Sequence, residues 1–365
     1  MGIYIALMVV TLLLAMFIKQ TTPQPYAENS LQSGRKTRQQ ILNRVCIFGI
    51  FSLLFAVSAL RTGIGNDYYK YRIYFQNIYK GFEHTLEPGF SWFVIFMQKV
   101  FGYDQYRIIF AAFAFATIFF FLKGIYQQSD WFVFSFFLFM AIGCYLNSYS
   151  TVRYYFALSL ALYSMKYVLK KDYPRFIFWI ILGALFHKSV LFVIPVYYIA
   201  ALNWKRWFYI GLGILSAALL FLPEVFRILI FTFYPFYEKS VYDTSEISYT
   251  NIARSLGTLL LTLIYYKKAV SGNHKMEFYF HLNILATIIY CFCSFIPVVS
   301  RIGYYCNIVQ IFLIPGVIMK IPDKKQKYFF GICVVLAFIL YFLLFLKKAQ
   351  GIDIRIVPYR TWLFE

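Results

Sequence analysis

Long runs of apolar residues alternate with short polar loops from one end of the chain to the other. A helix of about 17–25 apolar residues is long enough to cross the hydrocarbon core of a bilayer. The pattern predicts an all-α polytopic membrane protein with about 11–12 transmembrane helices and some interfacial or re-entrant helices. We expect residues 1–365 to form a single transmembrane domain.

The basic residues in the loops predict the orientation of these helices. The first loop should be cytoplasmic because it carries five basic residues: Lys19, Arg35, Lys36, Arg38 and Arg44. The next span then returns outward, so residues 61–105 form an extracytoplasmic loop with interfacial helices. One of these helices should be amphipathic, because five apolar residues recur at near-helical spacing: Tyr68, Tyr71, Phe75, Ile78 and Phe82. Residues 223–253 form a second extracytoplasmic loop by the same rule.

Residues 176–202 need a different interpretation, because His187-Lys188-Ser189 lies at their centre. A charged side chain in the middle of a lipid-facing helix is unfavourable. A broken hairpin with His187 at its outer tip removes this problem. It also keeps the later basic loops on the cytoplasmic side.

Composition and charge narrow the class of protein. The chain is 61% hydrophobic and only 14% charged, against about 25% charged residues in soluble domains. Its net charge of +20 lies mostly in short loops between spans, which favours membrane topology over nucleic-acid binding. The six cysteines lie in apolar segments without metal-ligand spacing. We therefore expect no metal, no other cofactor and no nucleic-acid partner.

Three arginines, Arg61, Arg153 and Arg301, stand where spans meet the outer side of the membrane on this topology. A guanidinium offers two parallel donors to phosphate oxygens and stays charged when partly buried. These arginines are therefore candidates for binding a diphosphate, although an arginine at a helix end can also extend to lipid headgroups. Four tyrosines nearby are candidates for sugar contacts: Tyr68, Tyr154, Tyr304 and Tyr305.

Asp67, Glu87 and His187 fall on the same predicted side and are candidate catalytic residues. A carboxylate or an imidazole can act as a general base toward a sugar hydroxyl. The two acids also have simpler interpretations, since each precedes a predicted helix and could act only as its cap. His187 could be an ordinary buried histidine.

Six short segments give the chain a family resemblance through their order and spacing. They are Gly65-Asn66-Asp67-Tyr68, Glu87-Pro88-Gly89-Phe90, Val152-Arg153-Tyr154-Tyr155, Leu185-Phe186-His187-Lys188-Ser189, Ser300-Arg301-Ile302-Gly303-Tyr304-Tyr305 and Pro358-Tyr359-Arg360. In these segments the chain resembles the EpsG-type exopolysaccharide polymerases, relatives of the Wzy O-antigen and capsule polymerases. It departs from them with Asn66 where the family more often has threonine, and with Tyr154 where glutamine is usual.

The resemblance implies a membrane glycosyltransferase of the bacterial cytoplasmic membrane, with a fold similar to the GT-C enzymes and an active site facing the exterior. Such an enzyme would transfer a growing glycan from undecaprenyl diphosphate to the non-reducing-end sugar of another lipid-linked repeat unit, without a metal and with inversion. Its partners would be undecaprenyl-diphosphate-linked oligosaccharides, membrane lipids and a chain-length regulator.

Three other functions compete with this one. A flippase or transporter of lipid-linked oligosaccharide also needs cations and aromatic rings, but it should open to both faces. A membrane O-acyltransferase would use a histidine such as His187, reachable from the cytoplasm. A ligase that moves finished glycan to another acceptor shares the polymerase chemistry, and the residues do not distinguish the two.

Overall fold

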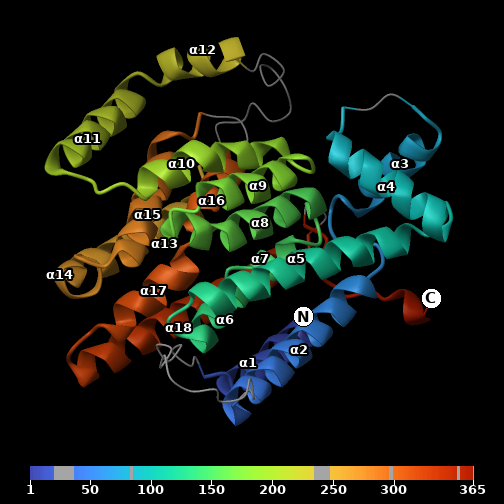
Figure 1. Ribbon diagram of the computed structural model, residues 1–365, viewed down its shortest axis with the longest axis horizontal. Coiled ribbons are helices and arrows are strands. Elements are labelled where there is room, and N and C mark those ends of the chain that lie inside the picture. Colours follow the sequence, from blue (N-terminus) through green and yellow to red (C-terminus); the bar gives the residue numbers. More distant parts are fainter. Residues whose placement is uncertain (20–36, 83–84, 234–246, 296–298, 352–353, 365) are drawn as a thin grey trace, which may run out of the picture. The chain divides into compact units, whose positions relative to one another are not determined.

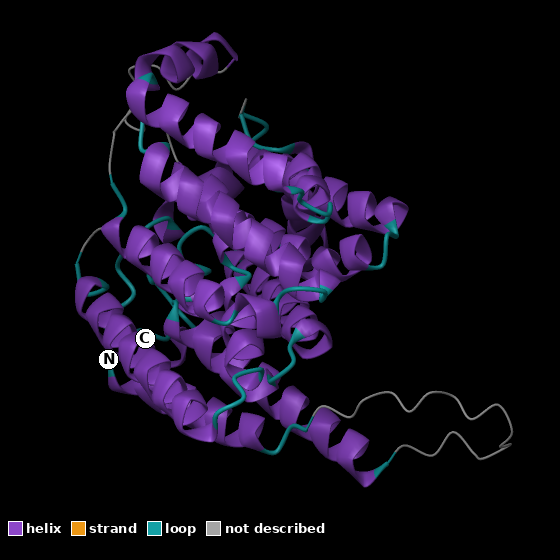
Figure 2. Cartoon of the chain, turned by 90° about the vertical axis from the view of Figure 1, so that its left-hand side faces the viewer, coloured by secondary structure: helices purple, strands orange, loops and turns teal. Residues whose placement is uncertain are grey.

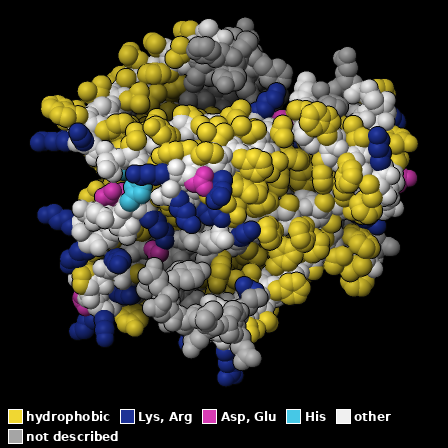
Figure 3. Space-filling view, in the orientation of Figure 1, with side chains coloured by type: hydrophobic (Ala, Val, Ile, Leu, Met, Phe, Trp, Pro, Cys, Tyr) yellow, Lys and Arg dark blue, Asp and Glu magenta, His cyan; other side chains and the backbone are white. Residues whose placement is uncertain are grey.

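The computed structural model describes residues 1–19, 37–82, 85–233, 247–295, 299–351 and 354–364 (Figure 1). All regular elements within these ranges are helices, apart from an isolated β-bridge between Arg61 and Thr361 (Figure 2). The chain is thus the all-α, polytopic membrane protein predicted from its hydrophobic pattern. Broad areas of its surface are covered by hydrophobic side chains, as expected for a lipid-facing exterior (Figure 3).

The chain folds into two compact units, a division that the hydrophobic pattern does not indicate. Unit 1 comprises Met1–Tyr163, Ile181–Lys188 and Lys325–Glu365. Its helices are α1 (Gly2–Met16), α2 (Arg38–Ala59), α3 (Tyr68–Tyr79), α4 (Pro88–Phe101), α5 (Tyr106–Gln128), α6 (Phe132–Ala141), α7 (Cys144–Asn147), the first part of α8 (Val152–Leu169), α18 (Lys324–Lys348) and the short 3-10 helix η3 (Trp362–Phe364).

Unit 2 comprises Ser164–Ile180 and Ser189–Lys324, and it includes the end of α8. Its other helices are α9 (Tyr173–Ala184, whose last turn belongs to unit 1), the 3-10 helix η1 (Lys188–Phe192), α10 (Val193–Ala200), α11 (Arg206–Phe221), α12 (Pro223–Phe233), α13 (Tyr249–Ile264), α14 (Tyr266–Ala269), α15 (His274–Phe292), α16 (Val299–Asn307) and α17 (Gln310–Met319).

Fewer helices are full-length spans than the sequence predicted. Among the described residues, four stretches are long and apolar enough to cross a membrane: α2, α5, Arg301–Met319 and α18. The bent pair α11–α12, with an angle of 92°, would make a fifth. Four further apolar helices have only 10–17 residues. The other apolar runs of the chain form helices that are shorter, bent or less apolar than these.

One such break confirms the predicted hairpin. The rings of Tyr173 and Tyr198 are 5.6 Å apart and those of Phe176 and Tyr197 are 6.1 Å apart. The start of α9 therefore lies beside the end of α10, and the chain reverses between them. His187 is in the turn between α9 and η1, at the predicted tip.

The loop that follows α2 also agrees with the predicted pattern. In α3, Tyr68, Tyr71, Phe75 and Ile78 are buried and form one face of the helix, as their spacing predicted. Phe82, the fifth predicted member of this face, is 57% exposed and lies beyond the end of the helix. The extracytoplasmic loop predicted at residues 223–253 contains α12, and its acidic residues Glu238, Asp243 and Glu246 lie outside the described residues.

The tail of the chain returns to the loop that contains Arg61. The Tyr359 hydroxyl donates to the carbonyl of Val57 (3.0 Å), and the Thr62 amide donates to the carbonyl of Arg360 (3.0 Å). The N-terminal helix reaches the same end of unit 1, where the Tyr4 hydroxyl donates to the carbonyl of Ile356 (2.9 Å).

Candidate functional site

An ion pair between Arg153 and Glu87 is the centre of the candidate site. Arg153 is the second residue of α8, and Glu87 is the residue before α4, whose first position is Pro88. Arg153 Nη1 donates to Glu87 Oε2, and the two side chains are 17% and 11% exposed. A mostly buried pair of this kind fixes both side chains, because separating them would leave a buried charge without compensation.

The tip of the α9–α10 hairpin joins this pair. The backbone amide of Lys188 donates to Glu87 Oε1 (3.2 Å), so both carboxylate oxygens are engaged. The His187 ring lies 5.4 Å from the ring of Tyr154, the residue after Arg153, in an edge-to-face arrangement. Three chain segments that the sequence separates therefore meet at one place within unit 1.

Two glycines, Gly89 and Gly65, allow these chain segments to approach one another closely. A Cβ at Gly89 would lie 2.5 Å from Leu185 Cβ and 2.8 Å from the Leu185 carbonyl oxygen. A Cβ at Gly65, where φ is +96°, would lie 2.8 Å from the carbonyl carbon of Tyr149. Only glycine permits these approaches of one backbone to another. The first brings α4 to the hairpin tip, and the second brings the loop before α3 to the segment before α8.

Tyr71 links Asp67 to the pair. The Tyr71 hydroxyl accepts a hydrogen bond from the backbone amide of Arg153 (3.3 Å). Burial raises the pKa of this hydroxyl, the Arg153 charge opposes the shift, and the Asp67 charge adds to it. Asp67 is the N-cap residue of α3, but its side chain makes no capping hydrogen bond. Its carboxylate therefore does not have the simple capping role that the sequence left open.

Asp67, Glu87, Arg153 and His187 together form what we call the Arg153 cluster. The guanidinium carbon of Arg153 lies 5.1 Å from the centre of the Phe90 ring. Its Nε is buried and has no hydrogen-bond partner among the described residues. Arg153 thus donates from Nη1 to Glu87, its side chain also interacts with the Tyr71 hydroxyl, and Nε is a further donor. Such a donor can bind an anionic oxygen, and the cluster supplies carboxylates and an imidazole for proton transfer.

Arg61 has a different environment within unit 1. It is 3% exposed, and its Nη1 donates to the backbone and side-chain oxygens of Ser58. The Tyr149 and Phe110 rings lie 4.7 Å and 5.4 Å from its guanidinium carbon. Arg61 is therefore a buried packing residue in this structure, and its guanidinium is not exposed to a diphosphate as the sequence predicted.

Arg301 belongs to unit 2, in α16, and is half-buried. The Arg153 cluster, by contrast, consists of residues of unit 1. Another arginine of unit 2, Arg254 in α13, lies 5.4 Å from the Tyr304 ring and donates from Nη2 to Asn251 (3.0 Å). Arg254 was not among the candidates predicted from the sequence, although it carries the same signal as Arg153, an arginine beside an apolar run.

Most of the tyrosines proposed to contact sugar are in the protein interior. Tyr68 is 1% exposed and stacks on Phe110 at 4.7 Å. Tyr305 is completely buried and its hydroxyl hydrogen-bonds Ser189 (3.0 Å). Tyr154 is 4% exposed, and Tyr304 is half-buried. The buried rings of Tyr68, Tyr154 and Tyr305 pack against neighbouring residues in the protein interior.

Comparison with known proteins identifies the family. Residues 44–361 match the EpsG family, nearly the whole chain. The chain belongs to the EpsG family. EpsG is a family of exopolysaccharide polymerases, and the matched range contains every residue of the Arg153 cluster. No curated protein matches the chain, and no solved structure does either. No three His, Cys, Asp or Glu side chains of the described EpsG chain are placed to hold a metal ion.

Proposed function

We propose that this EpsG protein transfers a growing glycan from undecaprenyl diphosphate to the non-reducing-end sugar of another lipid-linked repeat unit. The observation that carries the proposal is Arg153, a mostly buried cation held by Glu87 with its Nε donor unused among the described residues. A diphosphate leaving group is a polyanion, and a guanidinium stabilises the charge that develops as it leaves.

The Arg153 cluster supplies the remaining parts of a displacement reaction. A hydroxyl of the acceptor sugar attacks the anomeric carbon of the donor, the bond from that carbon to the diphosphate oxygen breaks, and the hydroxyl proton passes to a base. Asp67 is the preferred base, because its charge acts on Tyr71, whose hydroxyl accepts from the backbone amide of Arg153. Glu87 is a positioning residue, because both its oxygens already accept hydrogen bonds. His187 is the second candidate base, and Arg301 is a candidate ligand of the diphosphate.

The proposed reaction takes place at the outer face of the bacterial cytoplasmic membrane. Lys19 and Asn43 contact each other where α1 and α2 meet the first basic loop, at the opposite end of α2 from Arg61. The positive-inside rule puts this basic loop in the cytoplasm. The loop that contains Asp67 and Glu87 is then extracytoplasmic. Direct displacement in one step predicts inversion at the anomeric carbon.

The test is the glycan ladder of a strain whose only copy carries Arg153→Ala. We expect long polymer to disappear while lipid-linked single repeat units persist on the outer leaflet. Arg175→Ala is the matched control, because Arg175 forms an exposed ion pair with Asp172. Repeat units retained on the cytoplasmic leaflet would instead identify a flippase. An unchanged ladder in the Arg153→Ala strain would reject the proposed site.

A further inference from the structure

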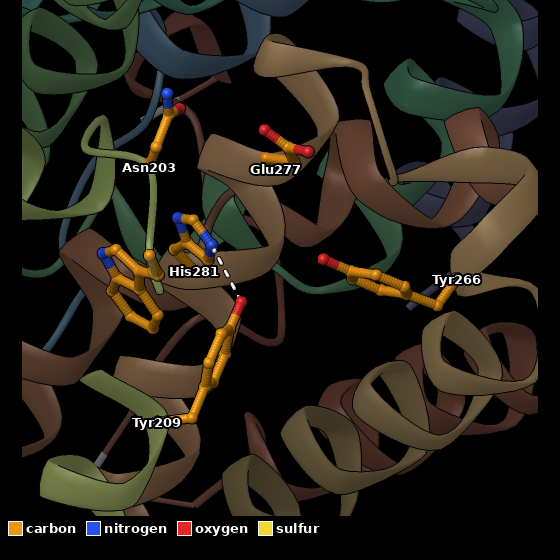
Figure 4. A pocket seen from close by; sticks show the side chains of 6 residues that line it. Asn203, Tyr209, Tyr266, Glu277 and His281 are labelled. Carbon is orange, nitrogen blue, oxygen red and sulfur yellow. Dashed lines mark hydrogen bonds between the residues drawn. The ribbon is translucent and has the colours of Figure 1, made fainter. Parts of the chain in front are cut away.

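Unit 2 contains a pocket that the polymerase proposal does not use. Its volume is about 230 Å³, enough for several water molecules or a small organic group. Six residues from four segments line it: Asn203, Trp204, Tyr209, Tyr266, Glu277 and His281 (Figure 4). They come from the α10–α11 loop and from α11, α14 and α15.

The hydrogen bonds of His281 determine which way the pocket's hydroxyls point. His281 is 3% exposed, and burial favours its neutral form. Its Nδ1 lies 2.8 Å from the carbonyl oxygen of Ala200, which can only accept, so Nδ1 carries the proton. Nε2 is then an acceptor, and the Tyr209 hydroxyl at 3.2 Å must donate to it. The Tyr209 oxygen keeps lone pairs that can accept from the neighbouring Tyr266 hydroxyl or from a ligand.

The rest of the lining also favours a ligand that donates hydrogen bonds. Glu277 is the one formally charged residue of the lining, and no ion-pair partner for it is present among the described residues. One of its oxygens accepts from the Gly272 amide (2.9 Å). In Figure 4 the Tyr266 hydroxyl points toward the same space as that of Tyr209. A carboxylate and two phenol oxygens give the three acceptors that an ammonium group requires.

The ring faces, by contrast, are already occupied. The Trp204 ring is stacked on His281 at 3.9 Å and also contacts Phe208 at 4.5 Å. A sugar ring or a nucleobase would therefore find no open face of Trp204 to stack on. The same packing disfavours a quaternary ammonium, which has no N–H donors and binds mainly through ring faces.

The surroundings of the pocket match the headgroup level of a membrane. Trp207 and Ile264, close in the chain to Tyr209 and Tyr266, are 78% and 64% exposed, as lipid-facing residues are. Basic residues flank the same segments: Lys205, Arg206, Lys267, Lys268 and Lys275. Lys and Arg side chains gather on this side of the view in Figure 3, where Figure 1 labels α14. This arrangement suits a zwitterion whose ammonium group lies in the pocket and whose phosphate lies among the flanking basic residues.

We propose that this pocket binds a primary ammonium group, which an aminophospholipid headgroup supplies from the leaflet that faces the basic loops. Glu277, Tyr209 and Tyr266 accept its three hydrogen bonds, while the flanking lysines attract the phosphate. Every lining residue belongs to unit 2, whereas the Arg153 cluster consists of residues of unit 1.

The test is native mass spectrometry of the full chain with phosphatidylethanolamine or phosphatidylcholine, two lipids that share a phosphate but differ in N–H donors. We expect phosphatidylethanolamine to be retained at least about tenfold more strongly than phosphatidylcholine. This is the effect of one charge-assisted hydrogen bond. Glu277→Gln keeps an acceptor for Gly272 and should abolish this preference, and Tyr209→Phe should reduce it. Glu224→Gln, in α12 of the same unit, should leave it intact, as should Arg153→Ala.

Equal retention of the two lipids by the parent chain, with no thermal stabilisation by free ethanolamine, would overturn the proposal. An unchanged preference in folded Glu277→Gln protein would overturn it as well. Stabilisation by ethanolamine but not by choline, without a lipid preference, would support the ammonium site and assign it to a soluble amine.

Discussion

Arg153 and Glu87, 66 residues apart in the chain, form an ion pair in which Glu87 also accepts a hydrogen bond from the amide of Lys188. One carboxylate thereby fixes the start of α8 and the hairpin tip relative to the start of α4. We expect a double-mutant cycle of Glu87→Ala and Arg153→Ala, measured by thermal unfolding in detergent, to give a coupling energy of about 1–3 kcal/mol.

The surface pair Asp172–Arg175 is the control for this measurement, because Arg175 is 72% exposed. Solvent screens such a pair, and its expected coupling is about 0.2–1 kcal/mol. A coupling between Glu87 and Arg153 no larger than that of the control would mean that the pair does not hold the three segments together.

Asp67 and Glu87 should differ in how their substitution changes the pH dependence of polymerisation. If Asp67 is the base, Asp67→Asn should lower the rate by about 10²–10⁴-fold and remove its rise with pH. Glu87→Gln should lower the rate but keep the shape of the profile, because Glu87 only positions Arg153. The measurement is the initial rate of polymer formation against pH in reconstituted membranes. If the rate of Glu87→Gln lost its rise with pH and that of Asp67→Asn kept it, Glu87 would be the base and Asp67 the positioning residue.

Gly89→Ala should separate α4 from the hairpin tip, because the added methyl would lie 2.5 Å from Leu185 Cβ. Overpacking of this kind destabilises by about 1–3 kcal/mol, and we expect polymer formation to fall with it. Gly257→Ala is the control, since a Cβ at Gly257 in α13 meets no atom within 4 Å. That control should be neutral or stabilising by up to about 1 kcal/mol. If Gly89→Ala and Gly257→Ala had the same unfolding temperature and the same glycan ladder, this role of Gly89 would be refuted.

Tyr359→Phe should loosen the tail from the end of α2. The Tyr359 hydroxyl donates to Val57, and burial raises its pKa, so the hydroxyl stays protonated and able to donate at neutral pH. Loss of this hydrogen bond should lower the free energy of unfolding by about 1 kcal/mol and expose the tail to protease. Tyr328→Phe, at a ring that is 70% exposed, serves as the control. Equal proteolysis rates for the two variants would contradict a structural role for Tyr359.

Much of the local structure of the Arg153 cluster could be predicted from the sequence. The spacing of Tyr68, Tyr71, Phe75 and Ile78 predicted one buried helix face, and the structure has it. The charge at Lys188 predicted the break after α9. The burial of Arg61 could not be predicted in the same way. Arg61 and Arg153 look alike in the sequence, but in the structure Arg61 donates to Ser58 and packs between two rings, whereas Arg153 pairs with Glu87.

By itself the sequence determined that the chain is helical and embedded in a membrane, because long apolar runs leave no other way to satisfy the backbone in lipid. It also determined which polar residues stand at the span ends. Only the tertiary structure decided that Glu87 pairs with Arg153, that Gly89 packs on Leu185, and that the acceptor-lined pocket forms around Glu277. These contacts join segments that are far apart in the chain. Hydrophobic periodicity reflects residues a few positions apart, so it does not predict which distant segments meet.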